Sequence, residues 1–184
     1  MKELSLHILD VAKNSVKAGA SLTEISVITA PDGIMTVKIK DNGCGMTEEV
    51  LSRVTDPFYT TRTTRKVGLG LPLFRMAAEQ TGGELKIVSS TEEGKSGTEV
   101  TVTFDTKSID CMPMGDIIST VCILVAGSPD RDFVFTDETE QRKVSLDTRE
   151  LKAVLGEDIS LAEPEIQSWM SEYLKEQYEN QTEI

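Results

Sequence analysis

The sequence predicts an α+β protein, a two-layer α/β sandwich in which helices pack on one face of a mixed, mainly antiparallel sheet. Residues 2–18 place apolar side chains along one side of a helix with 100° per residue, which is typical of a helix that covers a core. Residues 22–30 and 34–40 have the alternating apolar pattern of strands. Because the turn sequence Pro31-Asp32-Gly33 separates them, the two strands are expected to form a hairpin.

The elements that follow continue the same alternation of helices and strands. Thr47 is a plausible N-cap for a short helix that ends near Val54. Residues 67–83 then predict a glycine loop that enters a helix, which stops at Gly82-Gly83. Two further strands are expected at residues 84–90 and 98–104, on either side of a turn.

A change in composition near residues 105–115 predicts a boundary between a larger part, residues 1–106, and a smaller part, residues 107–184. The net charge is −2 over residues 1–105 and −10 over residues 106–184. The smaller part is therefore expected to be a small acidic α+β extension. Its predicted elements are a helix, two short strands and two further helices, at residues 117–126, 132–137, 143–147, 148–156 and 164–180.

The overall charge and hydropathy exclude several classes of protein. A formal net charge of −12 argues against nucleic acid as the main partner, because binding a polyanion depends on Lys and Arg. No run of 18 apolar residues predicts a membrane span, and the first residues lack the stages of a signal peptide, so a cytoplasmic location is expected. Three widely spaced cysteines suggest neither a zinc site nor a disulfide framework.

Four polar residues lie on one side of the first predicted helix. His7, Asp10, Asn14 and Lys17 are spaced by three, four and three residues, so their side chains are expected to point the same way. A solvated polar face would explain this stripe if the helix stood alone. A functional site is the alternative, and Asn14 favours it mildly because asparagine is less suited than Glu or Lys to the middle of a helix.

The hexapeptide DNGCGM, residues 41–46, ends the second strand. One interpretation is a turn in which Gly43 and Gly45 supply positive φ angles. The other is a ligand cradle, in which the glycines allow close approach and Asp41 accepts a hydrogen bond from an exocyclic amine. The glycines of KVGLGL, residues 66–71, lead directly into a helix whose N-terminus is suited to phosphate.

In order along the chain, these segments resemble the boxes of the GHKL ATPase superfamily, which includes gyrase, the heat-shock chaperone, histidine kinases and mismatch-repair ATPases. The first helix, with Asp10 and Asn14, resembles the N box, and DNGCGM resembles the first glycine box. DPFYTT, KVGLGL and SGTEVTVTF, residues 56–61, 66–71 and 96–104, are similar to the F box, the second glycine box and the final Gly-Thr strand.

The resemblance implies the Bergerat fold, with ATP held between the helix layer and a lid formed by residues 58–66. By analogy Asp41 accepts from adenine N6, assisted by Thr98 and Gly45, while Asn14 holds Mg²⁺ and Lys17 contacts phosphate. The full set of ATP-binding residues implied in this way is Asn14, Lys17, Asp41, Gly43, Gly45, Met46, Phe58, Thr60, Thr61, Lys66, Gly68, Leu69, Gly70, Leu71 and Thr98.

Differences from the family bear on the chemistry. The N-box helix starts at the second residue, so no phosphoacceptor hairpin is expected ahead of it, and His7 is expected to have a structural or lid-contacting role. The sequence NSVKAGA looks closer to mismatch-repair ATPases, in which a Glu four residues before the Asn activates water. Asp10 occupies that position here and is the candidate general base.

Two functions remain open at this stage. The leading one is an Mg-ATP-binding protein that hydrolyses ATP slowly or phosphorylates a separate partner protein. The rival is a nucleotide-gated binding module, similar to an anti-sigma factor. In such a module the nucleotide sets the conformation and the acidic part binds a partner protein. Trp169, Tyr173, Leu174 and Tyr178 lie at helical spacing and predict either a core stripe or an interface, and the oligomeric state is left open.

Overall fold

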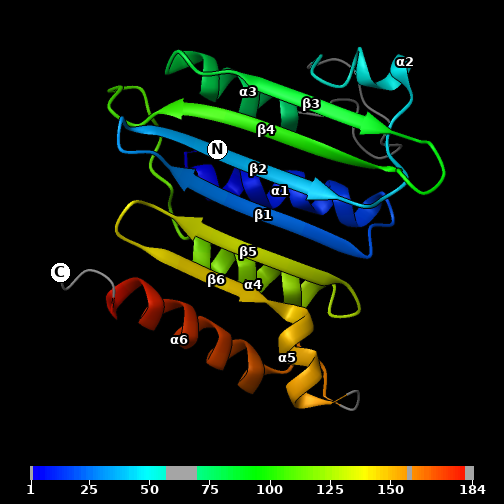
Figure 1. The fold of residues 1–184 in the computed structure, drawn as a ribbon, viewed down its shortest axis with the longest axis vertical. Coiled ribbons are helices and arrows are strands. Elements are labelled where there is room, and N and C mark those ends of the chain that lie inside the picture. The colour runs from blue at the N-terminus through cyan, green and yellow to red at the C-terminus, as the bar shows by residue number, and fades with distance from the viewer. Residues whose placement is uncertain (1, 57–69, 157–158, 181–184) are drawn as a thin grey trace.

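The computed structural model describes residues 2–56, 70–156 and 159–180 (Figure 1). Each predicted helix and strand in these ranges is present, with its ends shifted by a few residues at most. The helices are α1 (Leu4–Lys17), α2 (Glu48–Leu51), α3 (Gly70–Gln80), α4 (Ile117–Gly127), α5 (Thr148–Leu155) and α6 (Pro164–Asn180). The strands are β1 (Leu22–Thr29), β2 (Ile34–Asp41), β3 (Leu85–Ser90), β4 (Gly97–Asp105), β5 (Asp132–Glu138) and β6 (Lys143–Asp147).

The strands form one six-stranded sheet in the order β3-β4-β2-β1-β5-β6. Neighbouring strands are antiparallel except for β1 and β5, which pair in parallel, with Leu22 opposite Asp132. The predicted fold class, a mixed and mainly antiparallel sheet with helices, is therefore confirmed. The strands of the acidic part, β5 and β6, extend the sheet of the larger part.

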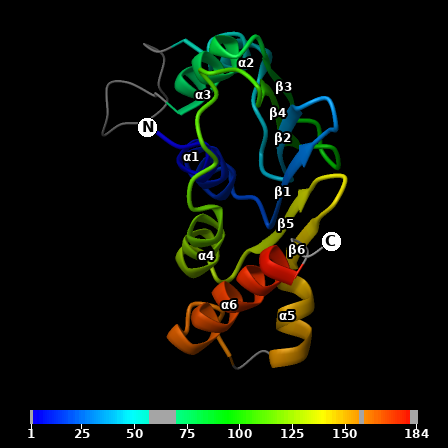
Figure 2. The same cartoon turned by 90° about the vertical axis from the view of Figure 1, so that its left-hand side faces the viewer.

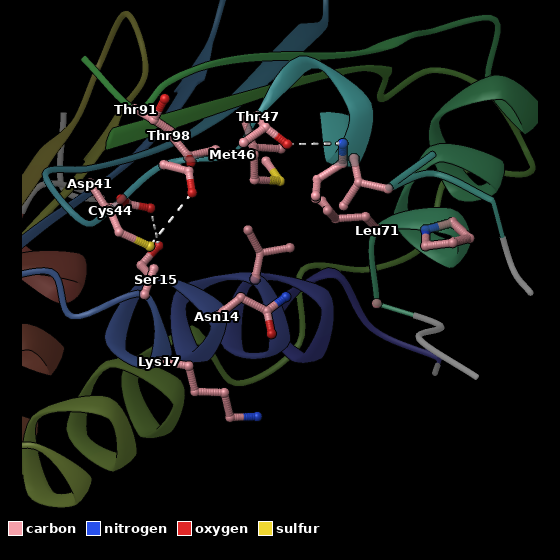
Figure 3. A pocket seen from close by; sticks show the side chains of 18 residues that line it. Asn14, Ser15, Lys17, Asp41, Cys44, Met46, Thr47, Leu71, Thr91 and Thr98 are labelled. Carbon is pink, nitrogen blue, oxygen red and sulfur yellow. Dashed lines mark hydrogen bonds between the residues drawn. The ribbon is translucent and has the colours of Figure 1, made fainter. Parts of the chain in front are cut away.

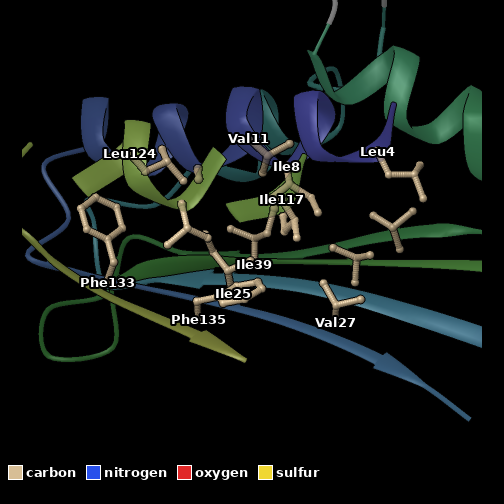
Figure 4. Packing of buried hydrophobic residues seen from close by; sticks show 14 of the residues in the cluster. Leu4, Ile8, Val11, Ile25, Val27, Ile39, Ile117, Leu124, Phe133 and Phe135 are labelled. Carbon is tan, nitrogen blue, oxygen red and sulfur yellow. The ribbon is translucent and has the colours of Figure 1, made fainter. Parts of the chain in front are cut away.

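Helices α1, α3 and α4 form a layer beside the sheet, as the side view shows (Figure 2). The core lies between these layers. Ile25, Val27 and Ile39 of the sheet lie beneath Ile8 of α1 and Leu124 of α4 (Figure 4). One hydrophobic cluster thus spans both parts of the chain, and the proposed division at residue 106 stays a prediction about sequence organisation.

The segment before α4 holds the beginning of α1 in place. The N-cap residue Glu3 makes no side-chain cap to the helix. Instead the backbone N–H groups of Leu4 and Ser5 donate to the carbonyl oxygens of Pro113 and Met114, at 3.0 and 2.8 Å. These bonds satisfy two of the N–H groups that a helix start leaves without intrahelical partners, and so they fix the position of the helix that carries the polar stripe.

Among the helices that the structure describes, none combines the length and the apolar character needed to cross a membrane.

Candidate functional site

A cavity of about 570 Å³ opens between α1, the loop after β2, α2, the start of α3 and strand β4 (Figure 3). Its lining includes eight of the residues that the sequence predicts for nucleotide binding, which come from segments far apart in the chain. These eight are Asn14, Lys17, Asp41, Gly45, Met46, Gly70, Leu71 and Thr98. The structure therefore brings the N box, the first glycine box, the start of α3 and the Gly-Thr strand together around one space.

Asp41 forms the polar end of the cavity, at the end of β2. Its Oδ2 accepts a hydrogen bond from the hydroxyl of Ser15 at 2.6 Å, and its Oδ1 accepts from the backbone N–H of Gly43 at 2.9 Å. A carboxylate has about four lone-pair sites, so each oxygen keeps capacity for a further donor. The two bonds hold the carboxylate at one orientation at the cavity wall.

Ser15 was not among the predicted site residues. It lies on α1 next to Asn14 and is buried, with 4% of its surface exposed. The sequence does contain a signal for it, because Ser15 falls among Ile8, Val11 and Ala12 on the apolar side of the helix. A small polar residue on an inward face requires a hydrogen-bond partner, and here that partner is Asp41.

Thr98 lies beside Asp41 because strands β2 and β4 pair in register at these two residues. The Ser89 hydroxyl donates to the carbonyl oxygen of Gly97 at 2.9 Å, and its oxygen lies 2.8 Å from the hydroxyl oxygen of Thr98. Ser89 in turn accepts from the backbone N–H of Met46 at 2.8 Å. These bonds connect the loop after β2 to strands β3 and β4 and set the shape of the polar end.

The two glycines of DNGCGM have different functions. Gly45 has a φ of +70°, and a Cβ there would lie 1.9 Å from the carbonyl oxygen of Ser90. Gly43 has no positive φ, but a Cβ would lie 2.9 Å from Cβ of Ala18. The interpretation in which both glycines supply positive φ is therefore wrong for Gly43, where close packing against the end of α1 is what requires glycine.

The remaining walls of the cavity are largely apolar. Side chains from α1, the first glycine box, the segment around α2, the start of α3 and β4 contribute to them, namely Val11, Met46, Val50, Val54, Leu71, Pro72 and Val100. Apolar walls with a few convergent polar groups are the usual composition of a small-molecule site. Such walls suit a flat, largely apolar group, and the Asp41 carboxylate is a fixed hydrogen-bond acceptor at their polar end.

Asp10 lies on α1 beside the start of α3. A Cβ on Gly70 would come within 2.6 Å of Asp10 Oδ2, so the carboxylate is against the first residue of α3. Asp10 is half-buried, and it is not among the residues that line the cavity itself. The first N–H groups of a helix are without intrahelical acceptors and favour negative charge, so this place suits both the carboxylate and a phosphate group.

His7 does not lie on a solvated polar face, and its environment is that of a structural residue, one of the two roles expected for it. It is 1% exposed, and its ring stacks on Phe74 of α3 with 5.1 Å between centroids and 6° between planes. Neither ring nitrogen has a hydrogen-bond partner among the described residues. Burial lowers the pKa of His7 below its usual 6.5, against a smaller opposing effect of Asp10. His7 therefore packs as a neutral core residue between α1 and α3.

The other residues of the stripe differ in environment. Asn14 is half-buried and lines the cavity, where its amide oxygen is a hard ligand of the type that Mg²⁺ accepts. Lys17 also lines the cavity, but its side chain is exposed and extends away from Asp41 in Figure 3. Within residues 2–56, 70–156 and 159–180 no cluster of three His, Cys, Asp or Glu side chains forms a metal site.

Some predicted residues do not lie in the cavity or cannot be placed. Gly43 is buried behind the lining and contributes its N–H to Asp41. Six others, together with the segment predicted as a lid, lie outside the described residues. These six are Phe58, Thr60, Thr61, Lys66, Gly68 and Leu69.

The fold is an α+β sandwich with this cavity between the helix layer and the sheet. Residues 2–108 match the sequence model of the family described as histidine kinase-, DNA gyrase B-, and HSP90-like ATPase. The match covers more than half of the chain, and the protein belongs to this ATPase family. The resemblance inferred from the motifs is thus confirmed.

Two groups of proteins are similar in sequence to this chain. The chain is 34% identical to sporulation kinase E of Bacillus subtilis over 95 residues, which is 52% of this chain and 12% of that protein. It is 26% identical to the DNA mismatch repair protein MutL of Bartonella tribocorum over 175 residues, or 89% of this chain and 26% of that protein. The chain therefore spans only a small part of the length of these relatives.

Solved structures give the same fold. One is the N-terminal domain of a DNA repair protein, with a TM-score of 0.57 and 15% identity, covering 85% of this chain and 58% of that one. Another is the ATPase domain of Aquifex aeolicus MutL complexed with ADP, with a TM-score of 0.52 and 15% identity, covering 84% and 69%. This coverage exceeds residues 1–106, so the likeness in fold extends beyond the segments that carry the resemblance in sequence.

Proposed function

We propose that the cavity binds ATP with Mg²⁺, and that the protein hydrolyses ATP slowly or passes its γ-phosphate to a separate partner protein. The observation that carries this proposal is the cavity itself. It joins a fixed carboxylate, Asp41, to the start of a helix at Gly70 and Leu71, and it includes Asn14 on the wall formed by α1. The ADP in the MutL structure of similar fold supports a nucleotide as the ligand.

Asp41 is the residue that would select adenine. The exocyclic N6 amine donates to the carboxylate, whose orientation is set by Ser15 and Gly43. Thr98, adjacent to Asp41 across the β2–β4 ladder, offers a hydroxyl for a second contact, directly or through water. Guanine carries a carbonyl in place of the N6 amine, so the same carboxylate would face an acceptor and reject that base.

The residues at the other end of the cavity fit the triphosphate and its metal. Asn14 is the candidate Mg²⁺ ligand, and the N–H groups at the start of α3 and the Lys17 ammonium are the candidates for phosphate contact. When bound, Mg²⁺ would neutralise phosphate charge. The apolar walls around Leu71 and Val11 exclude water from the base and leave the phosphates toward Asn14.

Asp10 is the candidate general base. It stands one helical turn before Asn14 and against the first residue of α3, which places a carboxylate at the helix end proposed to hold phosphate. There Asp10 would accept a proton from a water molecule or from a hydroxyl of the partner as that oxygen attacks phosphorus. This position supports the role that the resemblance to mismatch-repair ATPases implies for Asp10.

The test measures binding and turnover on the same preparation. Calorimetry with ATP and Mg²⁺ should show saturable binding to the purified protein, with much weaker binding of GTP. Phosphate release and transfer of labelled γ-phosphate to added proteins then measure chemistry. ATP binding without release or transfer would favour the second candidate, the nucleotide-gated binding module, for which the acidic C-terminal part is the supporting feature.

A further inference from the structure

The aromatic stripe predicted on the last helix is divided between two environments. Met170 and Leu174 of α6 are fully buried, and the hydroxyl of Tyr178 donates to Asp137 Oδ2 at 2.6 Å, so this side of the helix faces the protein. Trp169 and Tyr173 instead have 46% and 38% of their surface exposed. The interpretation of the stripe as core is therefore wrong for these two residues.

The two exposed rings form an ordered pair. Trp169 and Tyr173 are one helical turn apart and stack with 5.0 Å between ring centroids and an interplanar angle of 11°. Contact between the rings reduces the water-exposed area of each, yet a flat aromatic surface remains open to solvent. Exposed large aromatic side chains gathered at one place are typical of interaction sites, because Trp and Tyr dominate interface energetics.

Three glutamates lie on the same side of α6 as this pair. Glu165 and Glu172 lie four residues before and three residues after Trp169, and Glu176 lies three residues after Tyr173, so all three share the side of α6 that carries the rings. All three are exposed. These five residues, Glu165, Trp169, Glu172, Tyr173 and Glu176, are named here the α6 aromatic face.

The single lysine of α6 belongs to another side of the helix. Lys175 contributes to the lowered pKa of Asp116 at the start of α4, where hydrogen bonds from Ser119 are the larger cause. Its charge is therefore directed toward α4. The α6 aromatic face thus combines a π surface with three carboxylates, inside a region whose net charge is −10.

Charge complementarity selects among the possible occupants. A nucleic acid or an anionic lipid surface would be repelled by the three carboxylates. A second copy of the chain carries a net charge of −12 and would be repelled likewise. A purely apolar partner would bury the carboxylates without partners, which is costly. Only a cationic partner satisfies both the aromatic and the acidic groups.

We propose that the α6 aromatic face binds arginine side chains of a basic segment of another protein. A guanidinium group can lie flat on the indole of Trp169 within about 6 Å of the ring centroid while its N–H groups donate to a neighbouring carboxylate. Lysine would be held less well, because its compact ammonium group is more strongly hydrated and lacks the planar fork. This site lies apart from the nucleotide cavity and does not depend on ATP chemistry.

Trp169 makes the proposal directly testable, since it is the only tryptophan in the chain. The 184-residue chain is titrated with the capped peptide Arg-Gly-Arg-Gly-Arg while Trp169 emission is recorded. The same peptide with citrulline in place of every arginine keeps the shape and removes the charge, and a lysine version tests the planar group. The arginine peptide should change the emission saturably, the lysine peptide should bind more weakly, and the citrulline peptide should have no effect.

Variants distinguish binding of the peptide at the α6 aromatic face from general attraction of a basic peptide to an acidic protein. The triple variant Glu165→Gln, Glu172→Gln, Glu176→Gln should weaken binding about tenfold, and Tyr173→Ala should also weaken it while keeping the Trp169 reporter. The matched control, Glu93→Gln, Asp110→Asn, Glu140→Gln, removes the same charge from exposed positions outside α6 and should bind as the parent does. Equal weakening by both triple variants, or no response of Trp169 to the arginine peptide, would overturn the proposal.

Discussion

The hydroxyl of Ser15 donates to Asp41 Oδ2 at 2.6 Å, although 26 residues separate the two in sequence. This bond joins helix α1 to the end of β2 and fixes the carboxylate that we propose for adenine recognition. Gly43 N–H occupies the other carboxylate oxygen at 2.9 Å. The orientation of Asp41 is therefore set before any ligand binds.

Asp41→Asn should lower ATP affinity at least about tenfold while leaving the fold intact, because losing a charged acceptor for a desolvated donor costs about 1.5–3 kcal/mol. The amide would keep its oxygen toward Gly43 N–H and turn its NH₂ toward Ser15, which can rotate its hydroxyl to accept. One acceptor for N6 is then replaced by a donor. Calorimetry measures the affinity, with Asp110→Asn at an exposed position as the control. Parent-like affinity in Asp41→Asn would remove Asp41 from adenine recognition.

Ser15→Ala tests the support of the carboxylate separately from its charge. The variant removes one hydrogen bond to Asp41 Oδ2 but keeps both oxygens as acceptors, so it should weaken ATP binding less than Asp41→Asn does. Affinities from calorimetry for the two single variants and the double variant form a cycle. The effects should be non-additive, since both act on one carboxylate. Simple additivity would show that Ser15 does not position Asp41.

Gly45→Ala should destabilise the protein by more than about 1 kcal/mol through both strain and collision. The backbone φ is +70°, and the added Cβ would lie 1.9 Å from the Ser90 carbonyl oxygen, which belongs to the end of β3. Gly94→Ala is the matched control, because Gly94 also has a positive φ, +78°, but an added Cβ meets nothing within 4 Å. Urea unfolding should show a clearly larger loss for Gly45→Ala, and equal losses would contradict the close approach.

Much of the site could be predicted from sequence because each box combines a local pattern with a required residue type. Asp41, Asn14 and Thr98 were found in this way, and the structure places all three on one cavity. Ser15 was missed because its partner, Asp41, becomes its neighbour only when β2 packs beneath α1. Helical spacing also placed His7 on the same side as Asn14, but could not show that α3 covers that end of the helix with Phe74.

In the fold, too, contacts between segments distant in sequence could not be predicted from local patterns. Hairpins such as β1–β2 follow from local turn sequence, whereas the parallel pairing of β1 with β5 joins Leu22 to Asp132 across more than half of the chain. No local pattern encodes such a pairing, because many strands with alternating apolar residues are equally suited to it. The acidic part was therefore expected as an extension, and the structure shows its strands within the same sheet.

The buried His7 should make stability fall as the pH drops below about 6.5. Burial lowers its pKa in the folded state, so the unfolded chain binds the proton more readily. The stability contribution of neutral His7 is then complete above its unfolded pKa and is lost as the pH falls toward the folded value. Urea unfolding from pH 7.5 to 5 measures this loss. His7→Leu should flatten the profile in that window, and an unchanged slope would contradict the burial of a neutral ring.

Asp10→Asn separates ATP binding from chemistry. Asp10 lies against Gly70 at the start of α3 but does not line the cavity, so replacing its carboxylate by an amide of nearly the same shape should leave ATP affinity close to that of the parent. If Asp10 is the base that accepts the proton of the attacking water or hydroxyl, the rate of hydrolysis or transfer should fall by about 10² to 10⁴. Asn14→Asp, which alters the proposed metal ligand, should instead change both affinity and rate. Turnover by Asp10→Asn at the parent rate would exclude Asp10 as the base, while a parent protein that binds ATP but never turns it over would leave the nucleotide-gated binding module as the better account.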